Sequence, residues 1–77
     1  MTRATILDWT EASVQVKLGM MRDVKYQVYR DDDTHYLQLC ASDGEHIHTL
    51  ELPDGMKLDR TSYEVLLRYV LLDVVAA

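Results

Sequence analysis

The chain has 77 residues, of which 48% are hydrophobic and 27% charged, and its formal net charge is −5. This length fits one small domain, contains no stretch of about 18 apolar residues that could cross a bilayer, and begins without the apolar run of a secretory signal. A single cysteine, Cys40, excludes an intramolecular disulfide, so the composition indicates a protein of a reducing compartment such as the cytoplasm.

The first segment, residues 2–12, is compatible with two structures. Asp8-Trp9-Thr10-Glu11 could cap a helix that continues through Val14, Leu18 and Met21. The alternative is a short strand, which would bring the sheet described next from four strands to five. We adopt the strand as our prediction for this segment.

From Val14 onward, apolar and polar side chains alternate with a period of two, which is typical of strands. Short links between these strands favour an antiparallel meander. With a helix near the carboxy terminus, the pattern predicts a single α+β domain, a sheet of four or five strands with one helix packed on one face. The four strands are expected at Val14–Leu18, Val24–Tyr29, Thr34–Cys40 and His46–Leu52.

Two of the links predict which residues lie opposite each other. A two-residue turn at Asp32-Asp33 would place Val28 opposite Leu37, and one at Asp43-Gly44 would place Leu37 opposite Leu50. Both pairings bring apolar side chains to the same face of the sheet, so the registers agree with each other.

The link at Met20–Asp23 is looser. Pairing Leu18 with Val24 would set two lysines opposite each other, and like charges in that position are destabilising. We therefore expect a slipped register in which Leu18 lies opposite Tyr26.

A helix is predicted after the fourth strand. Leu52-Pro53-Asp54-Gly55 is typical of a turn that ends a strand. Thr61-Ser62-Tyr63-Glu64 matches a capping box, in which a threonine hydroxyl and a glutamate carboxylate satisfy free backbone donors at a helix start. The helix is expected to continue to about Val75.

This helix carries more apolar surface than one sheet can cover. A second stripe, Val65, Tyr69 and Leu72, lies apart from the first on a helical wheel. Either the amino-terminal segment folds over it, with Ile6, Leu7 and Trp9, or a second chain covers it. A homodimer through the second stripe is the self-association we expect. The first stripe consists of Tyr63, Leu66, Leu67, Val70 and Val74.

Little in the sequence indicates catalysis. His46 and His48 share one side of a strand and His35 lies on the next, but in the expected register they do not converge to the zinc–nitrogen distance of about 2.0–2.1 Å. Cys40 is expected on the opposite face from all three histidines, without a base to activate it. The glycines are isolated and form no phosphate loop. We therefore expect a non-enzymatic protein without metal or cofactor.

One face of the predicted sheet suggests nucleic acid as a ligand. Tyr29 and Tyr36 would lie side by side there, near Lys17 and Lys25, and bases of single-stranded nucleic acid stack on such rings. The net charge of −5 opposes phosphate binding. Tyr29 and Tyr36 could instead be an ordinary cross-strand pair that stabilises the sheet.

Charge is distributed unevenly, with a sum of +2 over residues 1–30 and −7 over residues 31–77. Such an asymmetry can be scattered solvated charge, or an acidic surface for a basic partner, for example a protein that itself binds nucleic acid. The leading hypothesis is a small protein-binding inhibitor. Antagonists of phage-defence systems are often this short and acidic, a likeness of size and charge alone. The proposed acidic surface comprises Asp31, Asp32, Asp33, Asp43, Glu45 and Asp54.

Overall fold

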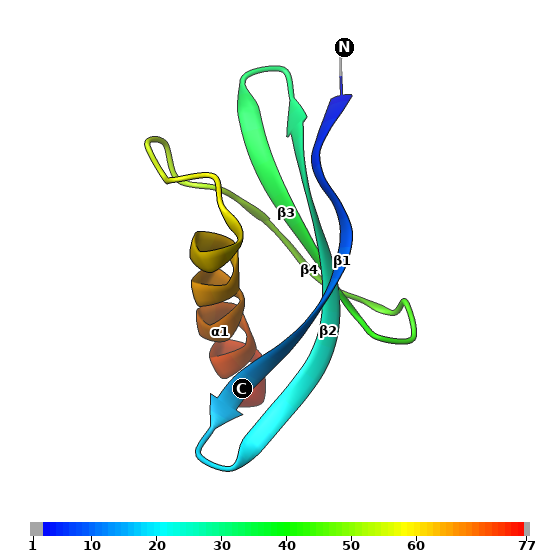
Figure 1. The fold of residues 1–77 in the computed structure, drawn as a ribbon, viewed down its shortest axis with the longest axis vertical. Helices are drawn as coiled ribbons and strands as arrows, with labels where there is room; N and C mark the ends of the chain where they lie inside the picture. The colour runs from blue at the N-terminus through cyan, green and yellow to red at the C-terminus, as the bar shows by residue number, and fades with distance from the viewer. Residues whose placement is uncertain (1–2, 77) are drawn as a thin grey trace.

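The computed structural model describes the backbone of residues 3–76 and the side chains of residues 3–72. It contains a four-stranded antiparallel sheet in the order β1-β2-β3-β4, with α1 lying across one face (Figure 1). The predicted α+β class and meander order are confirmed, with four strands. The elements are β1 (Arg3–Lys17), β2 (Met20–Asp31), β3 (Thr34–Ala41), β4 (His46–Glu51) and α1 (Arg60–Ala76).

The amino-terminal segment is a strand, as predicted, but it is continuous with the next predicted strand and forms the 15-residue β1. The helix alternative is wrong. The β1–β2 register shifts between Thr5 and Leu7, between Leu7 and Thr10, and again after Gln15. Such bulges bend a strand and increase its twist, which lets one long strand follow the curved sheet in Figure 1.

Both registers considered for the first hairpin are wrong. The turn is Leu18-Gly19, and Gly19 has a φ of 76°, a left-handed conformation that glycine adopts without steric cost. This tight turn sets Ala12 opposite Val24 and Glu11 opposite Lys25, which pairs opposite charges instead of two lysines. Leu18 lies at the tip of the hairpin and is 95% exposed.

The second hairpin has the predicted register. Val28 lies opposite Leu37 and Tyr29 opposite Tyr36 without interruption. Its two-residue turn contains Asp32 at a φ of 55°, a conformation that aspartate tolerates better than most residues.

Ala41 and Glu45 close the third hairpin around three residues, 42–44, so the predicted two-residue turn is wrong. The Gly44 N–H donates to the Ala41 carbonyl at 2.9 Å, and the Ala41 N–H donates to the Glu45 carbonyl at 2.8 Å. A bulge at Ile47 absorbs the extra residue, so Leu37 still lies opposite Leu50 as predicted.

The start of α1 also differs from its prediction. Asp59 Oδ1 accepts a hydrogen bond from the Ser62 N–H at 2.8 Å, so Asp59 is the capping residue and the helix begins at Arg60. The capping box predicted for Thr61 and Glu64 is therefore wrong. Glu64 instead pairs with Arg60 at 3.6 Å.

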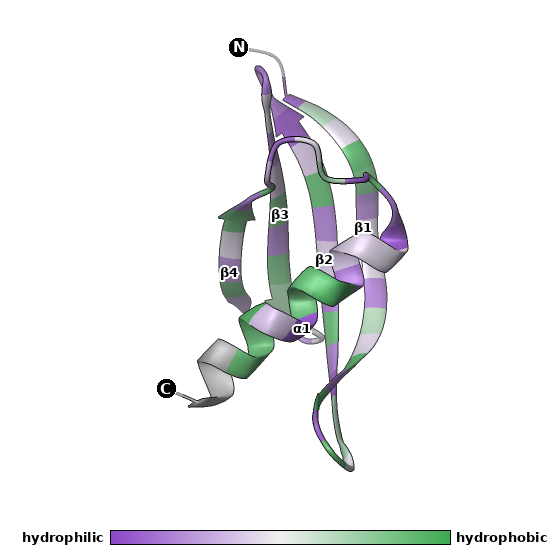
Figure 2. Cartoon of the chain, turned by 90° about the vertical axis from the view of Figure 1, so that its left-hand side faces the viewer, coloured by the Kyte–Doolittle hydropathy of each residue, from purple (hydrophilic) through white to green (hydrophobic). Residues whose placement is uncertain are grey.

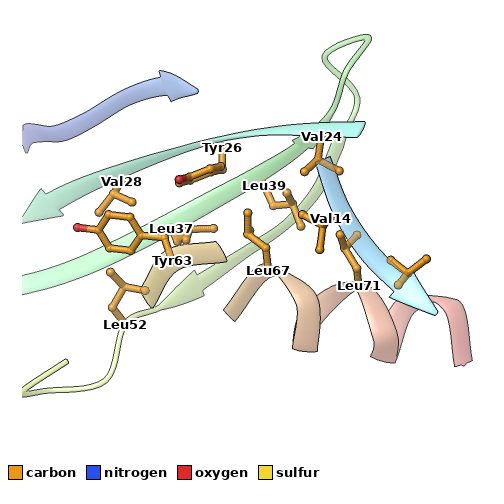
Figure 3. Packing of buried hydrophobic residues seen from close by; sticks show 11 residues of the cluster. Val14, Val24, Tyr26, Val28, Leu37, Leu39, Leu52, Tyr63, Leu67 and Leu71 are labelled. Carbon is orange, nitrogen blue, oxygen red and sulfur yellow. The ribbon is translucent and has the colours of Figure 1, made fainter. Parts of the chain in front are cut away.

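The core lies between α1 and the sheet face beneath it, as Figure 3 shows. Tyr63 and Leu67 of the predicted first stripe are buried, and Leu66 and Val70 pack at its margin. Leu71 is fully buried although the predicted stripe omits it, and the side chain of Val74 lies outside the described residues. The sheet contributes Val14, Val16, Val24, Tyr26, Val28, Leu37 and Leu39, with Leu52 just after β4.

No described helix has both the length and the apolar character needed to cross a membrane.

Candidate functional site

The second apolar stripe of α1 is open to solvent. Val65 is 51% exposed, Tyr69 66% and Leu72 37%. The expected cover by the amino-terminal segment is wrong, because that segment pairs with β2 instead, and its own Ile6 and Trp9 are each 43% exposed. We call Val65, Tyr69 and Leu72 the apolar stripe.

A groove of about 440 Å³ lies between α1 and the β1–β2 hairpin. Met21 and Val65 both line it, so it joins the apolar stripe to exposed apolar side chains of the hairpin. Figure 2 shows that the first turn of α1 lies in front of β1, the strand at that edge of the sheet. The lining residues are Ser13, Val14, Gln15, Met21, Arg60, Thr61, Glu64, Val65 and Arg68.

The groove is slightly positive on a chain whose net charge is −5. Of its three charged residues, Arg60 and Glu64 form an ion pair. Arg68 takes part in no ion pair among the described side chains. Among the described side chains, the groove therefore presents one guanidinium without an ion-pair partner, beside exposed apolar side chains.

The sheet face away from α1, which we call the outer face, carries the predicted tyrosine pair. The rings of Tyr29 and Tyr36 stack with centroids 5.5 Å apart, and the Arg3 guanidinium lies 3.8 Å from the centroid of Tyr29. Because Arg3 comes from β1 and Tyr36 from β3, they cover Tyr29 from its two sides. Tyr36 in turn lies opposite Glu51 of β4. Both tyrosines are partly buried and Tyr29 has a neighbour on each side, so a base has less access to its ring.

The two lysines of the predicted outer-face platform are not brought together. Lys17 lies opposite Met20 at the end of the first hairpin, whereas Lys25 lies opposite Glu11 in the middle of the sheet. The Lys25 Nζ is 5.8 Å from the centroid of the Trp9 ring, a favourable cation–π geometry.

The six acidic residues divide between the two ends of β3. Asp31, Asp32 and Asp33 lie at the β2–β3 turn, and Asp33 lines one small hollow together with Asp54. Asp43 and Glu45 belong to the β3–β4 loop at the other end of the strand. Eight residues of β3 separate the two groups by about 23 Å. They form two acidic ends rather than one surface.

The histidines and Cys40 do not assemble a reactive site. The bulge at Ile47 places His46 opposite Cys40, so the expectation that all three histidines face away from the thiol is wrong for His46. The His46 Nε2 hydrogen-bonds to the Thr49 hydroxyl at 2.8 Å, and Cys40 is buried. Over the described residues, no three His, Cys, Asp or Glu side chains gather closely enough to hold a metal ion.

Sequence reasoning missed the groove, because the groove depends on the course of β1. A signal for that course was present at Gly19, which suits a tight turn and would have placed residues 13–15 near the helix. No protein-family model, curated protein or solved structure matches this chain.

Proposed function

We propose that this protein is a non-enzymatic binding protein whose main binding surface is the apolar stripe of α1 with the adjoining groove. The exposure of Val65, Tyr69 and Leu72 is the observation that carries the proposal. Fully burying an exposed side chain of this size is worth on the order of 1.5–3 kcal/mol, and covering these partly exposed ones would contribute a fraction of that. Aromatic residues and methionine are also enriched at protein interfaces. Three large apolar side chains on one helix face are also a liability for a protein that remains alone.

The chemistry of a second contact follows from the acidic end at the β2–β3 turn. We propose that Asp31, Asp32, Asp33 and Asp54 meet a basic surface on the partner, such as one that otherwise holds nucleic acid. Opposite charges on the two partners accelerate their association and exclude wrong partners more than they add affinity. An inhibitor that occludes a basic surface would work in this way. Asp43 and Glu45, at the other end of β3, are the weaker part of this proposal.

Binding of single-stranded nucleic acid is a weaker proposal than protein binding. Arg3 and Tyr36 already occupy the two sides of Tyr29, and Glu51 lies opposite Tyr36, where it would repel phosphate. The tyrosine pair therefore supports the sheet better than it would support a base.

Affinity capture from cells that contain the protein tests the proposal, with quantitative mass spectrometry of the captured proteins. Tyr69→Asp places a charge in the apolar stripe at a site that is 66% exposed, so the monomer should fold normally. Ser42→Asp adds the same charge to the exposed β3–β4 loop and is the matched control. Proteins captured by the wild type and by Ser42→Asp should be lost with Tyr69→Asp. Identical capture by all three would refute the proposed binding surface.

The acidic contact has a separate test. Changing Asp31, Asp32 and Asp33 to Asn removes three charges without changing side-chain size. Association with a captured partner should become slower and lose most of its dependence on salt concentration. An unchanged association rate would leave the apolar stripe as the sole contact.

A further inference from the structure

We propose that the end of the β1–β2 hairpin, residues 17–22, docks on an anionic lipid surface and inserts Leu18 and its apolar neighbours among the headgroups. We call these six residues the hairpin tip. The inference goes beyond the proposed function, because the hairpin tip is a different surface from the apolar stripe and its partner is a bilayer rather than a protein.

The first step concerns the apolar side chains of the hairpin tip, which the fold itself does not need. Leu18 is 95% exposed, Met21 56% and Met20 41%. The turn requires a special residue only at Gly19, whose φ is 76°, and polar residues are the usual companions of glycine in such turns. Exposed apolar side chains that gather at one place mark contact sites for proteins or membranes.

The second step is the shape of the hairpin tip, which favours a lipid surface over a protein. Figure 1 and Figure 2 show that the tip lies at one end of the long axis and extends beyond α1. A specific protein interface covers about 800 Å² on each partner, more than six residues at the end of a narrow projection present. Apolar groups of peripheral proteins enter the headgroup region by about 5–10 Å. At about 3.3 Å per strand residue, this depth takes in Leu18 and both methionines.

The third step is the charge of the hairpin tip, which complements an anionic surface. Lys17 and Arg22 flank the apolar residues, and no acidic residue occurs between Glu11 and Asp23. Neither Lys17 nor Arg22 forms an ion pair among the described side chains. Basic side chains next to inserted apolar groups reach the lipid phosphates and strengthen binding to anionic membranes. The tip is therefore basic on a chain whose net charge is −5.

The fourth step concerns the three consecutive aspartates, which lie at the opposite end of the molecule. β2 runs from the hairpin tip to Asp31, and its 12 residues span about 36 Å along the strand. Figure 1 shows the two turns at opposite ends of the long axis. Repulsion between exposed charges decays over about 8 Å at physiological salt, so Asp31, Asp32 and Asp33 do not oppose docking by the tip. They point away from the bilayer, where the proposed basic partner can reach them.

Cosedimentation of the full chain with lipid vesicles tests the proposal. The protein should bind vesicles of phosphatidylcholine mixed with phosphatidylserine. Its affinity for vesicles of phosphatidylcholine alone should be roughly 30-fold lower, because two basic side chains each contribute to binding at an anionic surface. Raising the salt concentration should remove most of this difference. Equal binding to both kinds of vesicle, or binding to neither, would overturn the proposal.

Variants of the hairpin tip identify the residues that bind. Leu18→Asp should lower the affinity for mixed vesicles by about tenfold or more, because it removes an inserted side chain and adds a repelled charge. Ser42→Asp adds the same charge to the exposed β3–β4 loop and should bind like the wild type. Lys17→Gln should lower the affinity by about fivefold. Circular dichroism should be unchanged, since Leu18 is 95% exposed. Full binding by Leu18→Asp, or an equal loss with Ser42→Asp, would contradict insertion of the tip.

A fluorescent label reports insertion directly. Cys40 is buried, so the new thiol of Leu18→Cys can be labelled selectively with a polarity-sensitive nitrobenzoxadiazole group. Its emission should increase and shift to shorter wavelength when mixed vesicles are added. The same label at Ser42→Cys is the matched control and should not respond. Binding without a response at position 18 would overturn insertion.

The outcomes separate this inference from the proposed function. Leu18→Asp should leave the capture of proteins intact, and Tyr69→Asp should leave vesicle binding intact. Vesicle binding that only Tyr69→Asp abolishes would place the bilayer on the apolar stripe and overturn the assignment to the hairpin tip. Captured proteins that Leu18→Asp loses, without any vesicle binding by the wild type, would show that the tip contacts a protein instead.

Discussion

The outer face of the sheet and the outward side of α1 are both uncovered by the chain itself, yet they are built differently. On the outer face, Arg3, Tyr29 and Tyr36 stack, and Gln27 donates to Gln38 at 2.7 Å. On α1, the apolar stripe makes no aromatic or cation–π contact among the described side chains, and it remains exposed. Exposure alone therefore does not identify a binding surface. Exposed side chains without such contacts are the better candidates for one.

The sharpest test compares the two sides of α1. Leu67 is fully buried, and Leu67→Ala should lower the free energy of unfolding by about 2–5 kcal/mol, since it leaves a cavity in the core. Tyr69→Ala, on the outward side, should change the stability of the monomer by no more than about 0.5 kcal/mol. Urea denaturation at low protein concentration measures both. Similar losses for the two variants would mean that the stripe supports the monomer fold.

The second test asks whether the outer face is held by its own contacts. A double-mutant cycle with Tyr29→Leu and Tyr36→Leu should give a coupling of about 0.5–1.5 kcal/mol in the free energy of unfolding, because stacked aromatic pairs contribute that much. Thermal denaturation of the four proteins provides the values. Additive effects would show that the rings do not stabilise each other and would leave them available to a ligand.

The third test concerns the start of α1. The Ser62 N–H donates to Asp59 Oδ1 at 2.8 Å, and this backbone hydrogen bond holds the pKa of Asp59 below its ordinary value of 3.8. The stabilisation is complete above pH 3.8 and is lost as the pH falls through the lower pKa of the folded state. Asp59→Asn retains a capping side chain without a titrating charge.

Acid titration of unfolding compares the wild type with Asp59→Asn. The wild type should lose stability relative to the variant only below about pH 4, and the two curves should run parallel above pH 5. A difference that instead grows toward neutral pH would show that another group controls the cap.

The smallest effect is expected when the two outer-face tyrosines are removed and nucleic-acid binding is measured. A labelled oligothymidylate should bind weakly or not at all at low salt, and the variant with both Tyr29→Ala and Tyr36→Ala should behave like the wild type. Fluorescence anisotropy over a salt series measures this. Salt-sensitive binding that the double variant abolishes would reverse the ranking of the two surfaces.

The parts of the fold that follow from side-chain alternation were predictable. The β2–β3 register follows from apolar pairs such as Val28 and Leu37, joined by a turn of fixed length. The register of the first hairpin was not predictable, because alternation in residues 14–18 does not show where the turn lies. The position of the turn is set by Gly19. The bulges at Ile6 and Ile47 could not be predicted either, since an extra residue changes the strand pairing without changing the local order of apolar and polar residues.

The candidate site was predictable only in part. The spacing of Val65, Tyr69 and Leu72 identified an uncovered helix face without knowledge of the sheet. The groove depends on which residues of a 15-residue strand lie beside α1. That placement is a tertiary property. The acidic residues show the reverse error, because their common place in the acidic part of the sequence, residues 31–77, suggested one surface where β3 separates two groups.

Trp9 gives the chain an intrinsic optical reporter. It is the sole tryptophan of the sequence, it is partly exposed, and it lies on β1 two residues before Glu11. Its indole emission responds to the polarity of the surroundings, so a partner that covered this part of β1 would alter the spectrum without any label. Dilution followed in a fluorimeter can therefore reveal whether the molecule is solitary under the conditions of an assay.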